Sequence, residues 1–320
     1  MKDVLEILKN TFSGFSDDKV TKLSGSLAYS TLFSIGPLLI VVIAVCGIFF
    51  GQDAVEGKIY YELAQFLGRN AAIELQTIVK NAAISGKNTM AITIGSIVLF
   101  LGATSVFSEI QDSINGIWGI KPKPKKNWLK MIQNRFLSFS VIVSFGFLLL
   151  VSLTISAIID GMGHKLQVQF PGMILGVFYV LNLVATLVII TLIFAVIFKV
   201  LPDAKIKWKD VTIGSLLTAV FFMLGKFAIS YYIANSNVTT AFGATGSVLV
   251  LIVWVYYSSL ILYLGAEFTK SYAIKYGSEI LPSEYAVTTK QVEIETDKQS
   301  IQEKEKTAKT YTTQEESKTC

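Results

Sequence analysis

One ionisable side chain lies deep inside a long apolar stretch of this 320-residue chain. Lys226 is the only Asp, Glu, Lys or Arg between Val211 and Ala234. An ionisable residue inside a membrane is costly and marks a functional site by default, but a lysine can also reach the headgroups with its long stem. Both interpretations stay open for Lys226. If the ammonium is buried, it would suit the anionic head group of a substrate.

Two other residues fall at a matching depth on neighbouring apolar runs. Asn182 and Trp254 lie about as far from the outer ends of their runs as Lys226 does, roughly 12 Å at 1.5 Å per residue. Gly36-Pro37 is expected to break the first apolar run near its middle, and the carbonyls freed by such a break can line a cavity. We therefore predict a substrate site formed by these five residues.

Three carboxylates come at the other ends of the apolar runs, away from the predicted substrate site. Glu109 and Asp112 come at the end of the second run, and Glu267 comes at the end of the sixth. Charges at helix ends are often simply solvated, which is one interpretation. The small residues Gly265-Ala266 just before Glu267 permit close helix approach and favour the other, a cytoplasmic vestibule.

The sequence offers no obvious metal site or catalytic centre. It holds two cysteines and one histidine, and the motifs of hydrolases, nucleotide-binding loops and zinc proteases are missing. We expect no cofactor, no bound metal and no enzyme activity. The basic run Lys121–Lys126 directly follows an apolar run, so we interpret it as a topology determinant that touches lipid headgroups, with no nucleic acid as partner.

Six apolar runs must position these residues. A mean hydropathy of +0.56 with only 16% charged residues excludes an ordinary soluble enzyme. About 20 apolar residues cross the roughly 30 Å hydrocarbon core as a helix. We therefore predict an all-α polytopic membrane protein with six transmembrane helices, which run over Leu27–Phe50, Met90–Phe107, Phe136–Ile159, Met173–Phe198, Val211–Ala234 and Ala244–Phe268.

Basic residues predict the orientation of these helices. Most of the 28 Lys and Arg residues fall in segments that are cytoplasmic if both termini are inside. Residues 1–26 are expected to form an amphipathic cytoplasmic helix, lying on the membrane surface or packed under the bundle, and 27–276 the transmembrane domain. Residues 277–320 are too polar to bury a core and are expected to form a disordered cytoplasmic tail. An apolar stripe over 55–79 predicts an external amphipathic helical hairpin between helices one and two.

Several short blocks of the sequence are recognisable together. They are Gly25–Leu38 at the first run, Ile114–Trp118 after the second, Lys199–Pro202 with Trp208 after the fourth, and Phe242–Ala244, Trp254–Tyr256 and Gly265–Glu267 in the sixth. In order and spacing they resemble the YihY/virulence factor BrkB family of bacterial inner-membrane proteins. Phe242 stands where that family often has Tyr.

The resemblance implies a multi-pass protein of the bacterial inner membrane. The family is described as exporters, lipid- or envelope-related factors and serum-resistance proteins, with a ribonuclease label on some members. Metal-assisted phosphodiester cleavage needs clustered carboxylates or histidines, so we do not expect a ribonuclease. We predict a transporter or flippase-like exporter of a lipid or amphipathic envelope substrate, with membrane lipids, further copies of the chain or an envelope protein as partners. The alternative is a non-transporting scaffold that recruits envelope partners.

Overall fold

The computed structural model describes residues 2–50, 89–123, 174–235, 244–277, 279–284 and 286–289, with single residues and pairs between 56 and 77. Most of these residues are helical. The helices belong to one compact unit, Met1–Thr288. They are α1 Lys2–Asp17, α2 Val20–Phe50, α5 Thr89–Ile117, α7 Ile174–Val200, α8 Trp208–Asn235 and α10 Ala244–Tyr276.

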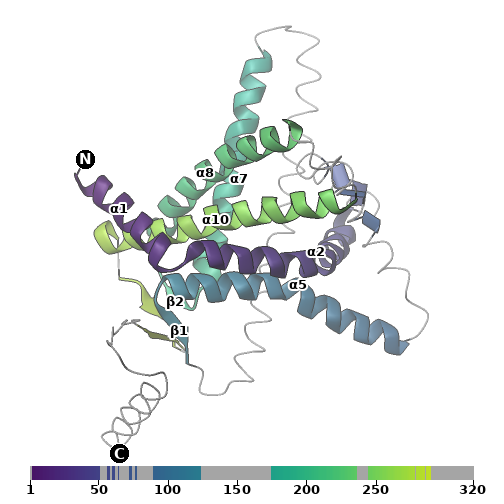
Figure 1. Ribbon diagram of the computed structural model, residues 1–320, viewed down its shortest axis with the longest axis horizontal. Coiled ribbons are helices and arrows are strands. Elements are labelled where there is room, and N and C mark those ends of the chain that lie inside the picture. The colour runs from purple at the N-terminus through teal and green to yellow at the C-terminus, as the bar shows by residue number, and fades with distance from the viewer. Residues whose placement is uncertain are drawn as a thin grey trace, which may run out of the picture. The chain divides into compact units, whose positions relative to one another are not determined.

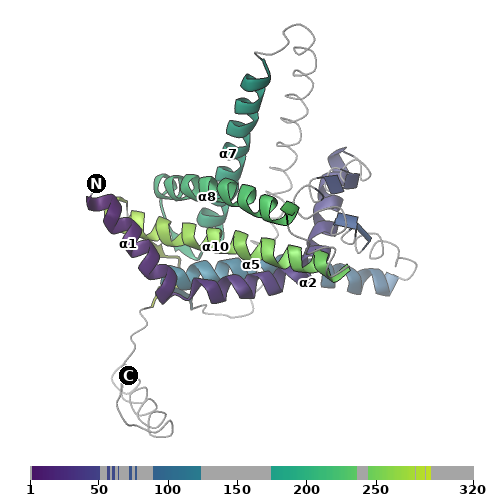
Figure 2. The same ribbon diagram turned by 45° about the horizontal axis from the view of Figure 1, so that its top comes forward.

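Helix α10 is the central helix of the bundle. It contacts α1, α2, α5 and α8, while α2 packs along α5 and α7 packs along α8. Figures 1 and 2 both show α10 between α8 on one side and α2 on the other. Every other described helix therefore touches α10 directly or through one neighbour.

A reciprocal pair of Gly and Thr residues brings α8 and α10 close together. A Cβ added to Gly214 would collide with the side chain of Thr269, and one added to Gly265 would collide with that of Thr218. Each threonine hydroxyl donates to the carbonyl four residues earlier on its own helix, at 2.7 Å, so it needs no partner across the interface. Small residues that let helix backbones approach closely are typical of membrane helix pairs.

The same antiparallel register continues along both helices. A Cβ on Gly225 would run into the ring of Tyr257. Together with the Gly–Thr pairs, this contact aligns α8 and α10 over several turns, which fixes the level of each side chain on one helix relative to the other.

The outer surface of the bundle is apolar and part of its interior is polar. Leu224 and Phe227 of α8 expose 64% and 76% of their surface, whereas Ser215 and Thr218 of the same helix expose none. The interior also holds a large apolar core, so it is the apolar outer surface that differs from a water-soluble domain. Among the described residues, three segments are long and apolar enough to cross a membrane: Leu183–Val200, Trp208–Ile229 and Val248–Tyr276.

These three segments match the fourth, fifth and sixth predicted spans. The first and second predicted spans lie within α2 and α5. The third, Phe136–Ile159, falls outside the described residues, so the number of six stays a prediction. Most of the predicted hairpin over 55–79 is also outside them, although the single residues described there are helical.

The first helices differ from the sequence-based expectation in two ways. A turn at Lys19, with φ of 52°, separates α1 from α2, so residues from Val20 onward belong to the first long helix and not to the surface helix. The predicted break at Gly36-Pro37 is also wrong, because α2 runs without interruption from Val20 to Phe50. A proline removes one backbone hydrogen bond, which a helix of this length tolerates when neighbouring helices support it.

Two short antiparallel ladders tie the chain after α10 to the linkers of the bundle. Strand β1 (Ile120–Pro122) pairs with β4 (Ala286–Thr288), and β2 (Ala204–Lys205) pairs with β3 (Leu281–Pro282). The expectation of disorder from residue 277 is therefore wrong for β3 and β4. Backbone pairing with segments about 80 and about 170 residues away orders them, and no local pattern signals such pairing.

The Gly–Thr contact predicts how a single methyl group affects stability. Gly265→Ala should destabilise the protein by about 1–3 kcal/mol, because the new Cβ meets Thr218 in a helix pair that cannot separate without losing its other contacts. Thermal unfolding of the detergent-purified protein measures the change. Gly25→Ala is the matched control, since a Cβ there meets no described atom within 4 Å. Equal melting temperatures for the two variants would contradict this packing.

Candidate functional site

Buried polar side chains gather at one end of the bundle, where α2 and α8 begin and α5, α7 and α10 end. We call it the α1 end, because α1 lies there. The largest of these side chains come from α5, α8, α10 and the linker between α7 and α8. Gln111, Asn115, Asp203, Asp210 and Glu267 each expose 6% of their surface or less. Polar groups buried to this degree need partners, so their contacts define the site.

Asp203 is the centre of one polar network. Its Oδ2 atom accepts hydrogen bonds from Asn115 Nδ2 at 3.0 Å and Gln111 Nε2 at 3.2 Å. Its backbone N–H donates to Asn115 Oδ1 at 2.8 Å, so Asn115 uses both ends of its amide on this residue. The network fastens the linker after α7 to the last turns of α5.

Glu267 is the centre of a second polar cluster, beneath α1. It exposes 1% of its surface, and a Cβ on Gly14 of α1 would come within 2.5 Å of its Oε2 atom. Lys270 Nζ lies 3.5 Å from Glu267 Oε2 and 3.2 Å from Asp18 Oδ2, so the lysine links the buried carboxylate to the turn after α1. Glu267 Oε1 has no hydrogen-bond partner among the described residues.

Helix α1 also contacts α10 along its length. Ile7 and Thr11, at 4% and 3% exposure, share the buried face of α1 with Gly14. Nearer the N-terminus, Lys275 Nζ lies 2.6 Å from Glu6 Oε2, but such exposed ion pairs contribute little to stability. The close approach at Gly14 and the buried side chains therefore hold α1 in place.

The three predicted vestibule carboxylates lie in three different surroundings. Glu109 accepts a hydrogen bond from Ser26 of α2 at 2.6 Å, and Asp112 is exposed. Glu267 was predicted to line a cytoplasmic vestibule, whereas in this structure α1 covers it. The sequence predicted an N-terminal helix on the membrane surface or packed under the bundle, but did not indicate which residue that helix would cover.

Lys226 lies on the inner side of α8. It follows Ser215, Ala219 and Phe222 at helical spacing, and the first two of these expose no surface. Lys226 itself is half-buried, while its neighbour Phe227, about 100° further round the helix, is 76% exposed. The backbone thus directs Lys226 toward the bundle and not toward the apolar outer surface.

Trp254 of α10 lies close to the level of Lys226 along the α8–α10 pair. Its ring lies edge-on to that of Phe222, with 5.7 Å between centroids, and Phe222 is one turn before Lys226 on the same face. Of the other predicted site residues, Gly36 is buried within α2. The side chains of Asn182, in α7, and of Pro37 lie outside the described ones.

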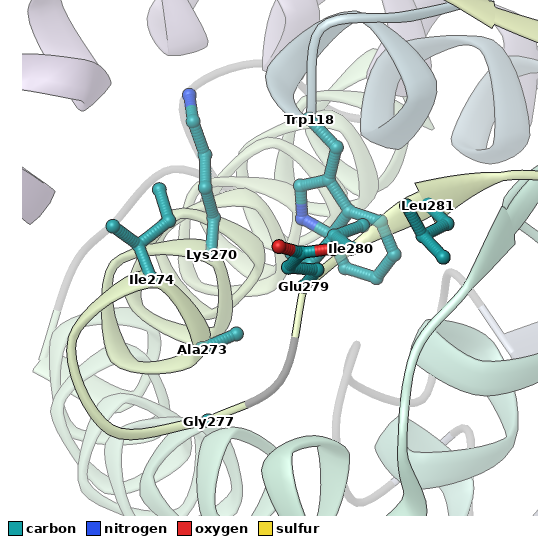
Figure 3. Close-up of a pocket in the computed structure, with 8 residues that line it drawn as sticks. All are labelled: Trp118, Lys270, Ala273, Ile274, Gly277, Glu279, Ile280 and Leu281. Carbon is teal, nitrogen blue, oxygen red and sulfur yellow. The ribbon is translucent and has the colours of Figure 1, made fainter.

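A cavity of about 470 Å³ lies beside the last turns of α10. Figure 3 shows Trp118 from the end of α5 and Leu281 of β3 on one side of it, and Ala273 and Ile274 of α10 on the other. The Lys270 amine extends away from Glu279 in this view, consistent with its ion pairs to Asp18 and Glu267. In the part of the chain that the structure describes, no three His, Cys, Asp or Glu side chains group as metal ligands.

Sequence reasoning missed the Asp203 network, although a signal for it was present. Asn115 and Trp118 belong to one short recognisable block, and Trp118 Nε1 donates to the carbonyl of Ala266, which belongs to another, at 3.1 Å. Asp203 follows a third block directly. The α1 end is thus the place where three of the recognisable blocks meet.

Apolar outer surfaces on membrane-length helices and polar groups buried between them define an α-helical, multi-pass integral membrane protein. The chain belongs to the virulence factor BrkB family, whose model matches residues 11–286. No solved structure matches it.

Similar proteins are membrane proteins of bacteria. UPF0761 membrane protein MS0032 of Mannheimia succiniciproducens is 27% identical, with 80% of this chain and 85% of the relative covered. A UPF0761 membrane protein of Aeromonas salmonicida is 28% identical, with 81% of this chain and 86% of the relative covered. One of Tolumonas auensis is 30% identical, with 79% of this chain and 80% of the relative covered.

The contact at Gly14 predicts that a side chain there releases α1. Gly14→Leu should push α1 off Glu267, because the new Cβ alone would come within 2.5 Å of a carboxylate oxygen. Trypsin should then cleave after Lys9 and Lys19 faster than in the wild type. Ser16→Leu, at an exposed position of the same helix, is the control and should leave cleavage unchanged. If both variants are cleaved at the wild-type rate, α1 is not held by this contact.

Proposed function

We propose that this protein is a transporter or flippase-like exporter that moves a lipid or amphipathic envelope substrate across the bacterial inner membrane, without catalysing a reaction. The observation that carries the proposal is the position of Lys226 on the inner side of α8. An ammonium held inside a membrane bundle is costly and is retained where it has a function. An anionic head group is the substrate chemistry that would use it.

The surroundings of Lys226 support an amphipathic substrate. Phe222 and Trp254 form an apolar wall one turn away, so an apolar portion and an anionic group could be bound at neighbouring levels. Such a site would lie within the α8–α10 pair, whose register the glycine contacts fix.

The α1 end supports a closed state of such a transporter. Helix α1 covers Glu267, and the Asp203 network fastens the linker after α7, so polar contacts hold the elements of this end together. Moving a substrate through the bundle requires alternate opening of its two ends. Because its outermost ion pairs are exposed and weak, α1 is the element that we expect to move.

A scaffold that recruits envelope partners is the second candidate function. Leu5 and Phe12 of α1 expose 73% and 63% of their surface on a face that α10 does not cover. A partner helix could pack on that face. Capture of a stoichiometric partner together with unchanged lipid distribution in a depleted strain would favour the scaffold.

We further propose six transmembrane helices with both termini in the cytoplasm. The excess of basic residues in the segments before α2, after α5 and between α7 and α8 supports this orientation. Reporter fusions after Ser16 and Lys207 should be cytoplasmic, and fusions after Ala71 and Asn237 should be external. A cytoplasmic reporter at Ala71 would refute the proposed topology.

Substitution of Lys226 tests transport. Lys226→Gln should lower lipid redistribution between the membrane leaflets about tenfold with insertion intact, because a charge-assisted contact to the substrate is lost. Lys226→Arg should also fail, since a planar guanidinium does not replace a compact ammonium. Lys226→Leu should remain stable but be inactive, whereas a lysine that only reaches the headgroups would gain about 3 kcal/mol of insertion free energy and keep its function. Redistribution is measured with a labelled phospholipid in vesicles containing the purified protein.

Lys209→Gln is the control, because this lysine is exposed in the first turn of the same helix. It should transport at the wild-type rate. Wild-type transport by all three Lys226 variants would show that Lys226 only reaches the outer headgroups, and the transport site would have to lie elsewhere.

A further inference from the structure

The linker between α7 and α8 is held at the depth of the lipid headgroups. One membrane-length segment ends at Val200 and the next begins at Trp208, so only residues 201–207 connect them. A connection this short keeps close to the surface of the hydrocarbon core. Trp208 is 56% exposed, and tryptophan is the residue type enriched at this level.

Two lysines of this linker point to the same open side. Ile206 is 3% exposed, whereas Lys205 and Lys207 on either side of it are exposed. In an extended segment alternate residues share one side, so burial of the isoleucine turns both lysines outward together. Pairing of Lys205 with Leu281 in the β2–β3 ladder fixes this orientation.

A third lysine stiffens the linker from within. The Nζ atom of Lys199 donates a hydrogen bond to the carbonyl of Ile206 and lies 5.7 Å from the centroid of the Trp208 ring. Lys199 therefore links the end of α7 to the start of α8. The site formed by the linker is built by the fold and does not depend on a ligand to shape it.

The outward lysines line a cavity of about 470 Å³. Its other lining residues are Ile206, Glu279 and Leu281. This volume is in the usual range of small-ligand sites. Two lysines and one glutamate are among these lining residues, so the described lining has a net positive charge.

We propose that this cavity binds the phosphate of an anionic phospholipid headgroup. Ammonium groups bind phosphate as point charges, and basic pockets beside membrane helices bind anionic lipids. At this depth the membrane presents lipid phosphate at a far higher local concentration than solution does. Leu281, 51% exposed, offers an apolar surface for the glycerol and the upper acyl chain. The site is separate from Lys226 and does not rest on transport.

Lipid binding to the purified full-length protein tests the proposal. Native mass spectrometry after titration with phosphatidylglycerol or phosphatidylcholine should show tighter binding of phosphatidylglycerol. Lys205→Gln and Lys207→Gln should each weaken phosphatidylglycerol binding about fivefold. Lys121→Gln and Lys123→Gln are the matched controls, since these lysines belong to the other linker and do not line the cavity. Equal losses in all four variants would indicate diffuse attraction and overturn the site.

A variant that is expected to bind lipid more tightly tests whether the losses in the lysine variants come from unfolding. Glu279→Gln removes the one carboxylate among the described residues that line the cavity. This variant should strengthen phosphatidylglycerol binding and leave phosphatidylcholine binding unchanged. Unchanged binding in this variant would count against the cavity. Excess inorganic phosphate should displace little lipid, and full displacement would show a site for free phosphate instead of lipid. The leaflet depends on the orientation proposed above, but the headgroup site does not.

Discussion

The close contact between α8 and α10 is the constraint on which the rest of the bundle depends. A threonine of the other helix packs against each of Gly214 and Gly265, so the two backbones approach more closely than larger side chains would permit. In a membrane, helices gain little from burying apolar surface against each other, and van der Waals contact at small residues supplies much of the attraction. Because α10 also contacts α1, α2 and α5, its position against α8 sets where the buried polar groups of all these helices fall.

The α1 end shows a second consequence of a membrane surrounding. Carboxylates and amides cannot face lipid, so they turn inward and pair with one another, as Asn115 does with Asp203. Glu267 is shielded in a different way, because Gly14 allows α1 to cover its carboxylate. The contacts at the α1 end are therefore mainly between polar groups that are buried or nearly so.

The short ladders add a tether that an all-helical description omits. Strands β3 and β4 bring the chain after α10 back to the linkers after α7 and α5. Glu279 and Leu281 consequently line the cavities on both sides of this segment. A change in lipid occupancy at Lys205 and Lys207 would thus act on the same strand that borders the end of α10.

The amino-acid sequence by itself determined that this is a helical membrane protein of the BrkB family, because long apolar runs and short family-like blocks are local properties of the chain. Its intramembrane lysine could also be singled out, since Lys226 stands alone in its run. Only the tertiary structure decided that α2 continues through Pro37, that α1 covers Glu267, and that Asn115 binds Asp203. These features depend on contacts between residues as many as 250 positions apart, and such contacts leave no periodic pattern in either partner.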